Sequence, residues 1–360
     1  MSDEGSTSVF SRDCDSVKPL EKCRPILVYT MTSGLGDFMV LGDLIRKIEK
    51  RIPGSHCLII HRDNPHVRLW PGSDGATRFF SIPSMKELNR FRRCLAAYRK
   101  SGHTVFGLQM APGSLQGFLL YRFLKKCGLL DYIVDFNLIN ADIITPPKGD
   151  YILDLHLNQV AELLQIDFPQ ECYHLELPIQ STLHYEKLHE SQRFIGIHPW
   201  SRRGHLSSFV WPFDKWMKLI QHILSEYPLC LVKIIGRDRS FGAFKDFLLE
   251  NIGASKERLV FAYSNSVGEL VDTIEGLDSL ITVNTAVVHI GYALRKQMFI
   301  LNGPSLDLWV PKGRNIHAIR DKKALFQASD KWEEDGNFGS ISRIDVDDVR
   351  AALLAHMTKE

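Results

Sequence analysis

A glycine-containing turn joins an apolar run to an amphipathic segment near the start of the chain. The run covers residues 26–29, and Gly34, Gly36 and Asp37 follow it. The order strand, glycine turn, helix is typical of parallel α/β sheets, and it puts the turn at the edge where such sheets bind ligands. Beyond the turn, apolar side chains recur at helical spacing: Leu41, Leu44, Ile45 and Ile48.

The same alternation continues through both halves of the chain, and it predicts βαβ units with parallel sheets. In the first half we expect strands at 55–61, 104–110 and 132–136, and helices at 38–51, 85–100, 115–126 and 156–165. In the second half we expect strands at 194–198, 229–235, 258–261, 279–283 and 298–301, and helices at 212–227, 241–251, 267–276, 287–294 and 344–357.

The length of 360 residues exceeds what one hydrophobic core usually supports, so we expect two domains. The predicted fold class is α/β, with two Rossmann-like domains that face each other. The predicted division is a disordered or extended tail at 1–24, an N-terminal domain at 25–185, a C-terminal domain at 186–340 and a final helix at 341–360.

Composition excludes several classes of protein. A formal charge of +2 gives no field for gathering nucleic acid. The seven cysteines are scattered without a CxxC pair, which argues against a zinc site and favours reduced thiols. No apolar span of 18 residues occurs, and the N-terminus is polar rather than signal-like. We therefore expect a cytoplasmic protein with at most peripheral membrane contact and no metal.

Asp37 has two interpretations. A carboxylate at a helix start is often a simple N-cap, worth ~1 kcal/mol. At the end of a strand in an α/β sheet it is also well placed to act as a general base. Ser33, Gly34 and Gly36 beside it would let the backbone approach a ligand closely. Because the third glycine of a dinucleotide fingerprint is absent, nicotinamide binding is weakly supported.

Two loops of the second half carry candidate anion-binding groups. His198 ends the first strand there, and Arg202 and Arg203 follow it. Paired guanidinium groups can neutralise a phosphate with fixed geometry, although the same pair could line a solvated loop. Gly236 ends the next strand, directly before a further basic pair.

The third candidate cluster follows the strand at 279–283. Asn284, Thr285 and Ala286 lead into a helix, and His289 lies in its first turns. Small polar residues at such a junction form an anion cradle from backbone N–H groups and the helix dipole. The alternative for His289 is a hydrogen-bonded core histidine.

The order of these motifs resembles glycosyltransferase family nine, the ADP-heptose heptosyltransferases of lipopolysaccharide synthesis. The matching elements cover roughly residues 25–358. They are the turn at 33–37, the histidine-led segment at 156–165, the loop with Trp-Pro at 195–216, the helix start at 284–289, and the Gly-Pro-Ser turn at 303–305.

The resemblance implies the GT-B fold and an inverting, metal-independent transfer of a sugar, with no cofactor. It implies that Asp37 is the general base, with Ser33, Gly34 and Gly36 on the acceptor side. The donor would be a nucleotide-sugar such as ADP-heptose, and the acceptor a glycan, a glycolipid or a small molecule. The donor-binding residues that it implies are His198, Arg202, Arg203, Gly236, Asn284, Thr285, Ala286 and His289.

Two departures from the family pattern keep other functions open. Asn284 stands where the family has an acid, and Ala286 where it has glycine. An amide supplies no charge, so a catalytically silent protein that binds nucleotide-sugars is one alternative. An NAD-dependent oxidoreductase is the other.

Overall fold

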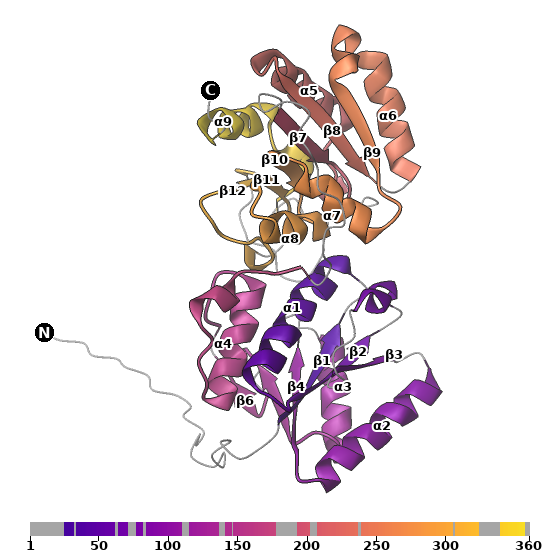
Figure 1. Cartoon of the computed structure of the whole chain (residues 1–360), viewed down its shortest axis with the longest axis vertical. Coiled ribbons are helices and arrows are strands. Elements are labelled where there is room, and N and C mark those ends of the chain that lie inside the picture. The colour runs from indigo at the N-terminus through magenta and orange to yellow at the C-terminus, as the bar shows by residue number, and fades with distance from the viewer. Residues whose placement is uncertain are drawn as a thin grey trace, which may run out of the picture.

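Two parallel sheets, each covered by helices on both faces, form the chain (Figure 1). The computed structural model describes residues 25–31, 34–61, 64–70, 77–81, 84–109, 115–136, 141–145, 147–177, 193–201, 207–236, 239–304, 307–323 and 339–356. The predicted tail at 1–24 and the predicted domain boundary near residue 185 lie outside these ranges. The predicted α/β class with two Rossmann-like sheets is confirmed.

The N-terminal sheet has the strand order β3-β2-β1-β4-β5-β6, and all its neighbouring strands are parallel. Its strands are β1 (Pro25–Met31), β2 (His56–His61), β3 (Thr77–Ser81), β4 (Thr104–Gln109), β5 (Tyr132–Asp135) and β6 (Ile143–Ile144). Its helices are α1 (Leu35–Arg51), α2 (Met85–Lys100), α3 (Leu115–Lys126) and α4 (Ile152–Leu164).

The C-terminal sheet has the order β12-β11-β10-β7-β8-β9, which is the same topology repeated, and it is also parallel. Its strands are β7 (Arg193–His198), β8 (Cys230–Gly236), β9 (Leu259–Tyr263), β10 (Ser279–Val283), β11 (Gln297–Asn302) and β12 (Ile316–Arg320). Its helices are α5 (Phe213–Glu226), α6 (Arg239–Asn251), α7 (Val267–Glu275), α8 (Ala286–Ala293) and α9 (Val346–His356).

The strand order of each sheet reverses beside its first strand, between β1 and β4 and again between β7 and β10. In an open α/β sheet the connections leave such a point in opposite directions, so ligands bind at the carboxyl ends of those strands. The topology therefore singles out the residues that follow β1, β7 and β10.

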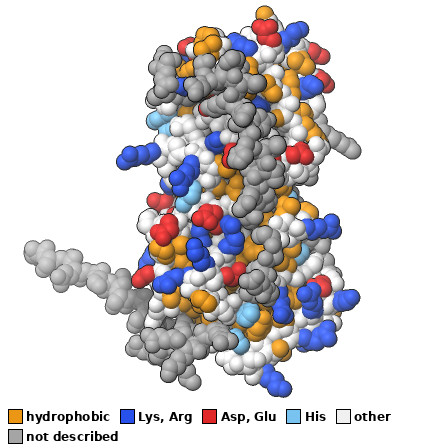
Figure 2. All heavy atoms as spheres, in the orientation of Figure 1, with side chains coloured by type: hydrophobic (Ala, Val, Ile, Leu, Met, Phe, Trp, Pro, Cys, Tyr) orange, Lys and Arg blue, Asp and Glu red, His pale blue; other side chains and the backbone are white. Residues whose placement is uncertain are grey.

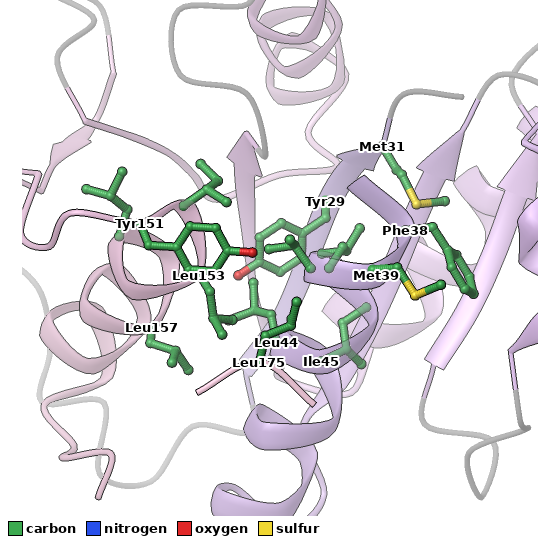
Figure 3. Close-up of a cluster of buried hydrophobic side chains, with 14 of the residues drawn as sticks. Tyr29, Met31, Phe38, Met39, Leu44, Ile45, Tyr151, Leu153, Leu157 and Leu175 are labelled. Carbon is green, nitrogen blue, oxygen red and sulfur yellow. The ribbon is translucent and has the colours of Figure 1, made fainter. Parts of the chain in front are cut away.

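One hydrophobic core runs through both domains. Strand alternation puts Leu27 and Tyr29 of β1 on the sheet face that α1 and α4 cover. Figure 3 shows this cluster, which includes Leu44 and Ile45 of α1 together with Tyr151 at the start of α4. The same cluster continues into the second domain, where residues of α7 and α8 join it. Burial of apolar surface thus holds the two domains together.

A buried ion pair fixes the segment that follows α4. Asp43 and Lys47 lie one turn apart on α1 and form a salt bridge. The Lys47 ammonium also donates to the carbonyl of His174 at 2.6 Å, and Glu176 N–H donates to Asp43 at 3.1 Å. The His174 ring packs on Tyr292 of α8, with centroids 5.1 Å apart. This polar contact therefore supports the apolar seam between the domains.

The far faces of the two sheets have separate cores. Phe91 of α2 and Tyr121 of α3 cover the N-terminal sheet there. Trp216 of α5 and Leu353 of α9 cover the C-terminal one. Trp211 anchors the turn before α9, because its indole N–H donates to the carbonyl of Ile344 at 2.9 Å.

Two predicted helices begin earlier in the structure than the sequence indicated. The first helix begins at Leu35 rather than 38, because Gly34 is its N-cap, so Asp37 lies inside the helix rather than in the turn. The helix predicted at 156–165 begins at Ile152, because its first turn is buried on several sides and shows no helical periodicity. Strands β3 and β12 lie at sheet edges and were not predicted, because half-exposed edge strands carry little apolar signal.

Gly196 in the middle of β7 allows close packing of the helix layer on the sheet. A Cβ atom there would overlap the Leu277 side chain and lie 3.1 Å from Ile235 Cδ1. We expect Gly196→Ala to lower the free energy of unfolding by roughly 1–3 kcal/mol. Gly242 on the exposed side of α6 is the matched control, because a Cβ atom added there would meet no atom within 4 Å and alanine favours helices. Urea unfolding of Gly196→Ala and Gly242→Ala measures the free energy of unfolding of each variant. Equal unfolding midpoints in the two variants would contradict the packing role of Gly196.

Candidate functional site

The first turns of α1 and α8 meet where the two domains touch. A Cβ atom on Gly36 would lie 2.9 Å from Cδ2 of His289 and 3.6 Å from the Cα of Ala286. Only glycine lets the two helix starts approach this closely without displacing the His289 ring. Figure 1 shows α8 directly above α1. The predicted acceptor-side turn and the predicted donor-side helix are therefore direct neighbours.

Asp37 is the third residue of α1 and is partly buried. The N-cap residue is Gly34, whose backbone is extended. The interpretation of Asp37 as the N-cap is therefore wrong. A carboxylate in the first turn still interacts favourably with the positive end of the helix dipole. Asp37 follows Gly36 directly, so it lies beside the junction with α8.

Candidate residues of the second domain form a row along the carboxyl edge of its sheet. His198 ends β7 and is paired in register with Thr282 of β10. The hydroxyl of Thr282 lies 3.3 Å from Nδ1 of His198. Asn284 follows β10, and its Nδ2 donates to Oδ1 of Asn302 at the end of β11, at 3.0 Å. The switch point between β7 and β10 thus has His198 on one side and Asn284 on the other.

Polar atoms at the start of α8 are buried and lack partners in the described part of the chain. They are the hydroxyl of Thr285, the N-cap of α8, and Nδ2 of Asn302 at the end of the neighbouring strand β11. Buried polar atoms almost always have hydrogen bonds, so a pair of unpartnered ones marks a place for a ligand or water. The first N–H groups of α8 open beside them, because a helix start has no internal acceptors for these groups. This arrangement suits an anion that also carries hydroxyl groups.

His289 is 3% exposed and contacts both domains. Its Nδ1 lies 2.7 Å from the hydroxyl of Tyr151 at the N-cap of α4. Burial lowers the pKa of His289 to about 4, so the ring is neutral near pH 7. Burial likewise lowers the pKa of His198 to about 4. Both rings can therefore act as neutral hydrogen-bonding groups rather than as fixed cations.

Gly236 has a packing role of its own. A Cβ atom there would overlap Phe241 and lie 2.6 Å from Nε1 of Trp200. That indole N–H donates to the carbonyl of Ile235 at 2.8 Å. The side chains of these neighbours fill the space that a side chain at position 236 would need, so this position requires glycine for packing. The predicted residues Ser33, Arg202 and Arg203 lie outside the described residues.

Tyr151 adjoins this site although no sequence motif marked it, and Asn302 adjoins it although the sequence indicated mainly a tight turn at 302–304. Tyr151 precedes a helix and is separated from His289 by 138 positions, so no local pattern links the two. Asn302 precedes a Gly-Pro turn and looks in the sequence like a part of it. The available signal was that Asn302 ends the strand beside β10, where a short polar residue can face a ligand.

The basic helix α2 lies away from this junction, on the far face of the N-terminal sheet. Figure 2 shows Lys and Arg side chains at the lower right of the molecule, where Figure 1 has α2. Arg90 pairs with Glu87, and Arg99 pairs with Asp131. These are exposed pairs of small energetic value.

The described residues contain neither a candidate metal site nor a candidate membrane span. No group of three or more His, Cys, Asp or Glu side chains among them could hold a metal ion. No helix in the described ranges is both long and apolar enough to cross a membrane.

No known family profile matches the sequence, and no curated protein matches it. Solved structures do match across nearly the whole chain. Escherichia coli heptosyltransferase WaaC with ADP matches with a TM-score of 0.57 and 13% identity, over 92% of this chain and 99% of that one. E. coli ADP-heptose LPS heptosyltransferase II matches with a TM-score of 0.55 and 17% identity, over 93% of this chain and 100% of that one. A family 9 glycosyltransferase from Veillonella parvula matches with a TM-score of 0.59 and 13% identity, over 94% of this chain and 98% of that one.

The chain has the GT-B fold of these heptosyltransferases. The predicted resemblance to glycosyltransferase family nine is confirmed at the level of fold. The iron-containing glycosyltransferase TibC from enterotoxigenic E. coli shares the fold, with a TM-score of 0.53 and 14% identity over 94% of this chain and 78% of that one. Identities this low leave the reaction to be argued from the site itself.

The buried neutral state of His289 makes stability depend on pH. Because its folded pKa of about 4 lies below the ordinary value near 6.5, the unfolded chain binds the proton first as pH falls. We expect protonation of His289 in the unfolded chain to lower the free energy of unfolding by roughly 2 kcal/mol as the pH falls from 7.5 to 5. Urea unfolding at both pH values should therefore show a smaller loss in His289→Gln than in the unaltered protein. An equal loss in both proteins would contradict the neutral state.

Proposed function

We propose that the chain is a glycosyltransferase that moves a sugar from a nucleoside diphosphate to an acceptor hydroxyl. The fold and the order of motifs favour ADP-heptose as the donor. WaaC binds ADP in one matching structure and ADP-2-deoxy-2-fluoro heptose in another. In this proposal the nucleotide-sugar is a substrate and no separate cofactor takes part. The acceptor is a glycan, a glycolipid or a small molecule with a free hydroxyl.

One observation carries the proposal, namely the contact between the first turns of α1 and α8. Gly36 lies against Ala286 and His289, and Asp37, the first-turn acid of α1, is the next residue. Thr285, the N-cap of α8, carries a buried hydroxyl that is unpartnered among the described residues. A sugar transferase needs a base beside the acceptor and an anion site beside the donor. In this proposal each domain supplies one of these, and the contact between α1 and α8 would bring them together.

In the proposed reaction Asp37 takes the proton from the acceptor hydroxyl. The oxygen then attacks the anomeric carbon of the donor sugar, and the bond from that carbon to the diphosphate oxygen breaks. Attack from the side opposite the leaving group inverts the configuration at that carbon. Asp37 suits the role because it is partly buried and is the acidic residue of the first turn of α1, next to Gly36.

The leaving diphosphate gains negative charge as the bond breaks. Backbone N–H groups at the start of α8 and the hydroxyl of Thr285 are preorganised donors for that charge. Arg202 and Arg203 belong to the loop after β7 and are proposed as its cationic partners. His198, Gly236 and Asn284 would line the nucleotide side of the site.

A second candidate function is binding of a nucleotide-sugar without turnover. Asn284 is neutral and is engaged with Asn302, where the family pattern has an acid. A site that binds the donor but does not activate it would serve a sensor or a scaffold. Turnover measurements distinguish the two functions directly.

Asp37→Asn tests the base. The amide keeps the size of the side chain but cannot accept the proton, so we expect transfer from ADP-heptose to fall by ~10²–10⁴-fold while ADP binding is retained. Release of ADP with a sugar acceptor measures the rate, and calorimetry measures binding.

Asp214→Asn is the matched control, because Asp214 is an exposed first-turn acid of α5, on the other domain. We expect full activity from it. Full activity in Asp37→Asn would disprove the role of Asp37. Tight nucleotide binding with no turnover in the unaltered protein would favour the second candidate function.

Thr285→Val tests the anion site. The valine removes a buried hydroxyl that has no partner among the described residues, so the free protein should be unchanged or about 1 kcal/mol more stable. ADP should bind about tenfold more weakly, because one donor to the diphosphate is lost.

Ser55→Ala is the control, since that hydroxyl is also buried and unpartnered among the described residues but precedes β2, at the amino edge of the N-terminal sheet. A thermal-shift screen of nucleoside diphosphates with all three proteins is the measurement. A ligand at 100 times its dissociation constant stabilises by ~2.7 kcal/mol, which such a screen detects. An unchanged shift with ADP in Thr285→Val would count against the site.

A further inference from the structure

A hydrogen bond between the two domains controls which nitrogen of His289 carries a proton. Tyr151 lies on the N-terminal domain, at the start of α4, and His289 lies on α8 of the C-terminal domain. The two side chains are 1% and 3% exposed, and the hydroxyl lies 2.7 Å from Nδ1. At this distance the two atoms form a direct hydrogen bond, without a bridging water.

The direction of this hydrogen bond follows from the surroundings of Tyr151. If Nδ1 donated to the phenol oxygen, the hydroxyl proton of Tyr151 would need another acceptor. The described residues provide no second partner for this hydroxyl within hydrogen-bond distance. A buried O–H without an acceptor is costly, whereas an O–H that donates to Nδ1 is satisfied. Tyr151 therefore donates, and Nδ1 of His289 accepts.

The proton of the neutral imidazole must then be on Nε2. That nitrogen lies 3.2 Å from the position that a Cβ atom on Gly36 would take, at the contact between the first turns of α1 and α8. No described residue accepts a hydrogen bond from it. The junction thus presents one N–H donor that comes from a side chain, next to the amide donors at the start of α8.

We propose that Tyr151 is a positioning residue that holds His289 as the Nε2–H tautomer and thereby aims this N–H at the diphosphate of the donor. The inference rests on the proposed function for the identity of the ligand, and on the geometry alone for the tautomer. Phosphate oxygens only accept hydrogen bonds, so the other tautomer would turn a lone pair toward the ligand. Because Tyr151 and His289 come from different domains, the donor site is complete only while the domains are packed together.

Tyr151→Phe tests the proposal, because phenylalanine keeps the ring packing and removes only the hydroxyl. Tyr292→Phe is the matched control, since the Tyr292 ring packs edge-on against Tyr151 at 5.3 Å but takes no part in the hydrogen bond.

Nitrogen NMR spectra of protein labelled at its 14 histidines report the tautomer of each histidine. The set of signals that disappears in His289→Gln belongs to His289. We expect Nε2–H alone in the unaltered protein and in Tyr292→Phe, and a mixture of tautomers in Tyr151→Phe.

ADP binding by calorimetry is the second measurement. We expect the dissociation constant to rise about five- to tenfold in Tyr151→Phe, the effect of one hydrogen bond, and to stay within about twofold in Tyr292→Phe. In the background of His289→Gln, Tyr151→Phe should add nothing, because Tyr151 acts through His289. Thermal unfolding of each variant without ligand accounts for any general loss of stability.

Three results would overturn the proposal. They are an Nδ1–H tautomer in the unaltered protein, unchanged ADP binding in Tyr151→Phe, and an equal loss of binding on the His289→Gln background. Failure of the unaltered protein to bind any nucleoside diphosphate would overturn the proposed function and the ligand assigned to Nε2. The tautomer spectra would still decide whether Tyr151 positions His289, so the two failures are distinguishable.

Discussion

The contact between the first turns of α1 and α8 is the interaction on which the arrangement of the two domains depends. Gly36 leaves room for the His289 ring and the backbone of Ala286, and the apolar cluster around them extends from the N-terminal sheet into α7 and α8. A side chain at position 36 would displace the His289 ring. The same glycine therefore serves both packing and the assembly of the candidate site.

Bringing two helix starts together also concentrates positive potential. Each contributes the equivalent of about half a positive charge from its free N–H groups, so the pair is repulsive unless something negative lies nearby. Asp37 supplies one negative charge from α1. His289 adds no further positive charge, because burial keeps it neutral. An anion bound at the start of α8 would neutralise the remaining positive potential. The buried Thr285 hydroxyl, unpartnered among the described residues, could donate a hydrogen bond to such an anion.

The sequence predicted the fold well because both halves follow local rules. Apolar periodicity located the helix Met85–Lys100 and the strand Ser279–Val283 at the bounds that the structure has. Placing candidate residues at strand ends also predicted which of them share an edge, as His198 and Asn284 do. These successes need only the connectivity of a parallel sheet, which fixes one edge as the site of all βα turns.

Contacts that depend on the packing of one domain on the other could not be predicted in this way. Tyr151 and His289 are far apart in sequence, and each lies in an apolar helix start that looks like ordinary core. Gly36 looks like a turn glycine, yet it is the second residue of a helix, where its role is to admit His289. These contacts depend on how the surfaces of the two domains pack together, so the sequence of one segment alone does not predict them.

The amide pair Asn284 and Asn302 bears on how this site would treat an anion. A carboxylate at position 284 would lie next to the start of α8 and repel a bound diphosphate unless a cation offset it. The amide removes that repulsion, and its hydrogen bond to Asn302 holds it in one orientation. The Nδ2 of Asn302, unpartnered among the described residues, then adds a donor to the same edge. An amide at position 284 therefore favours binding of negative charge at this edge more than a carboxylate would.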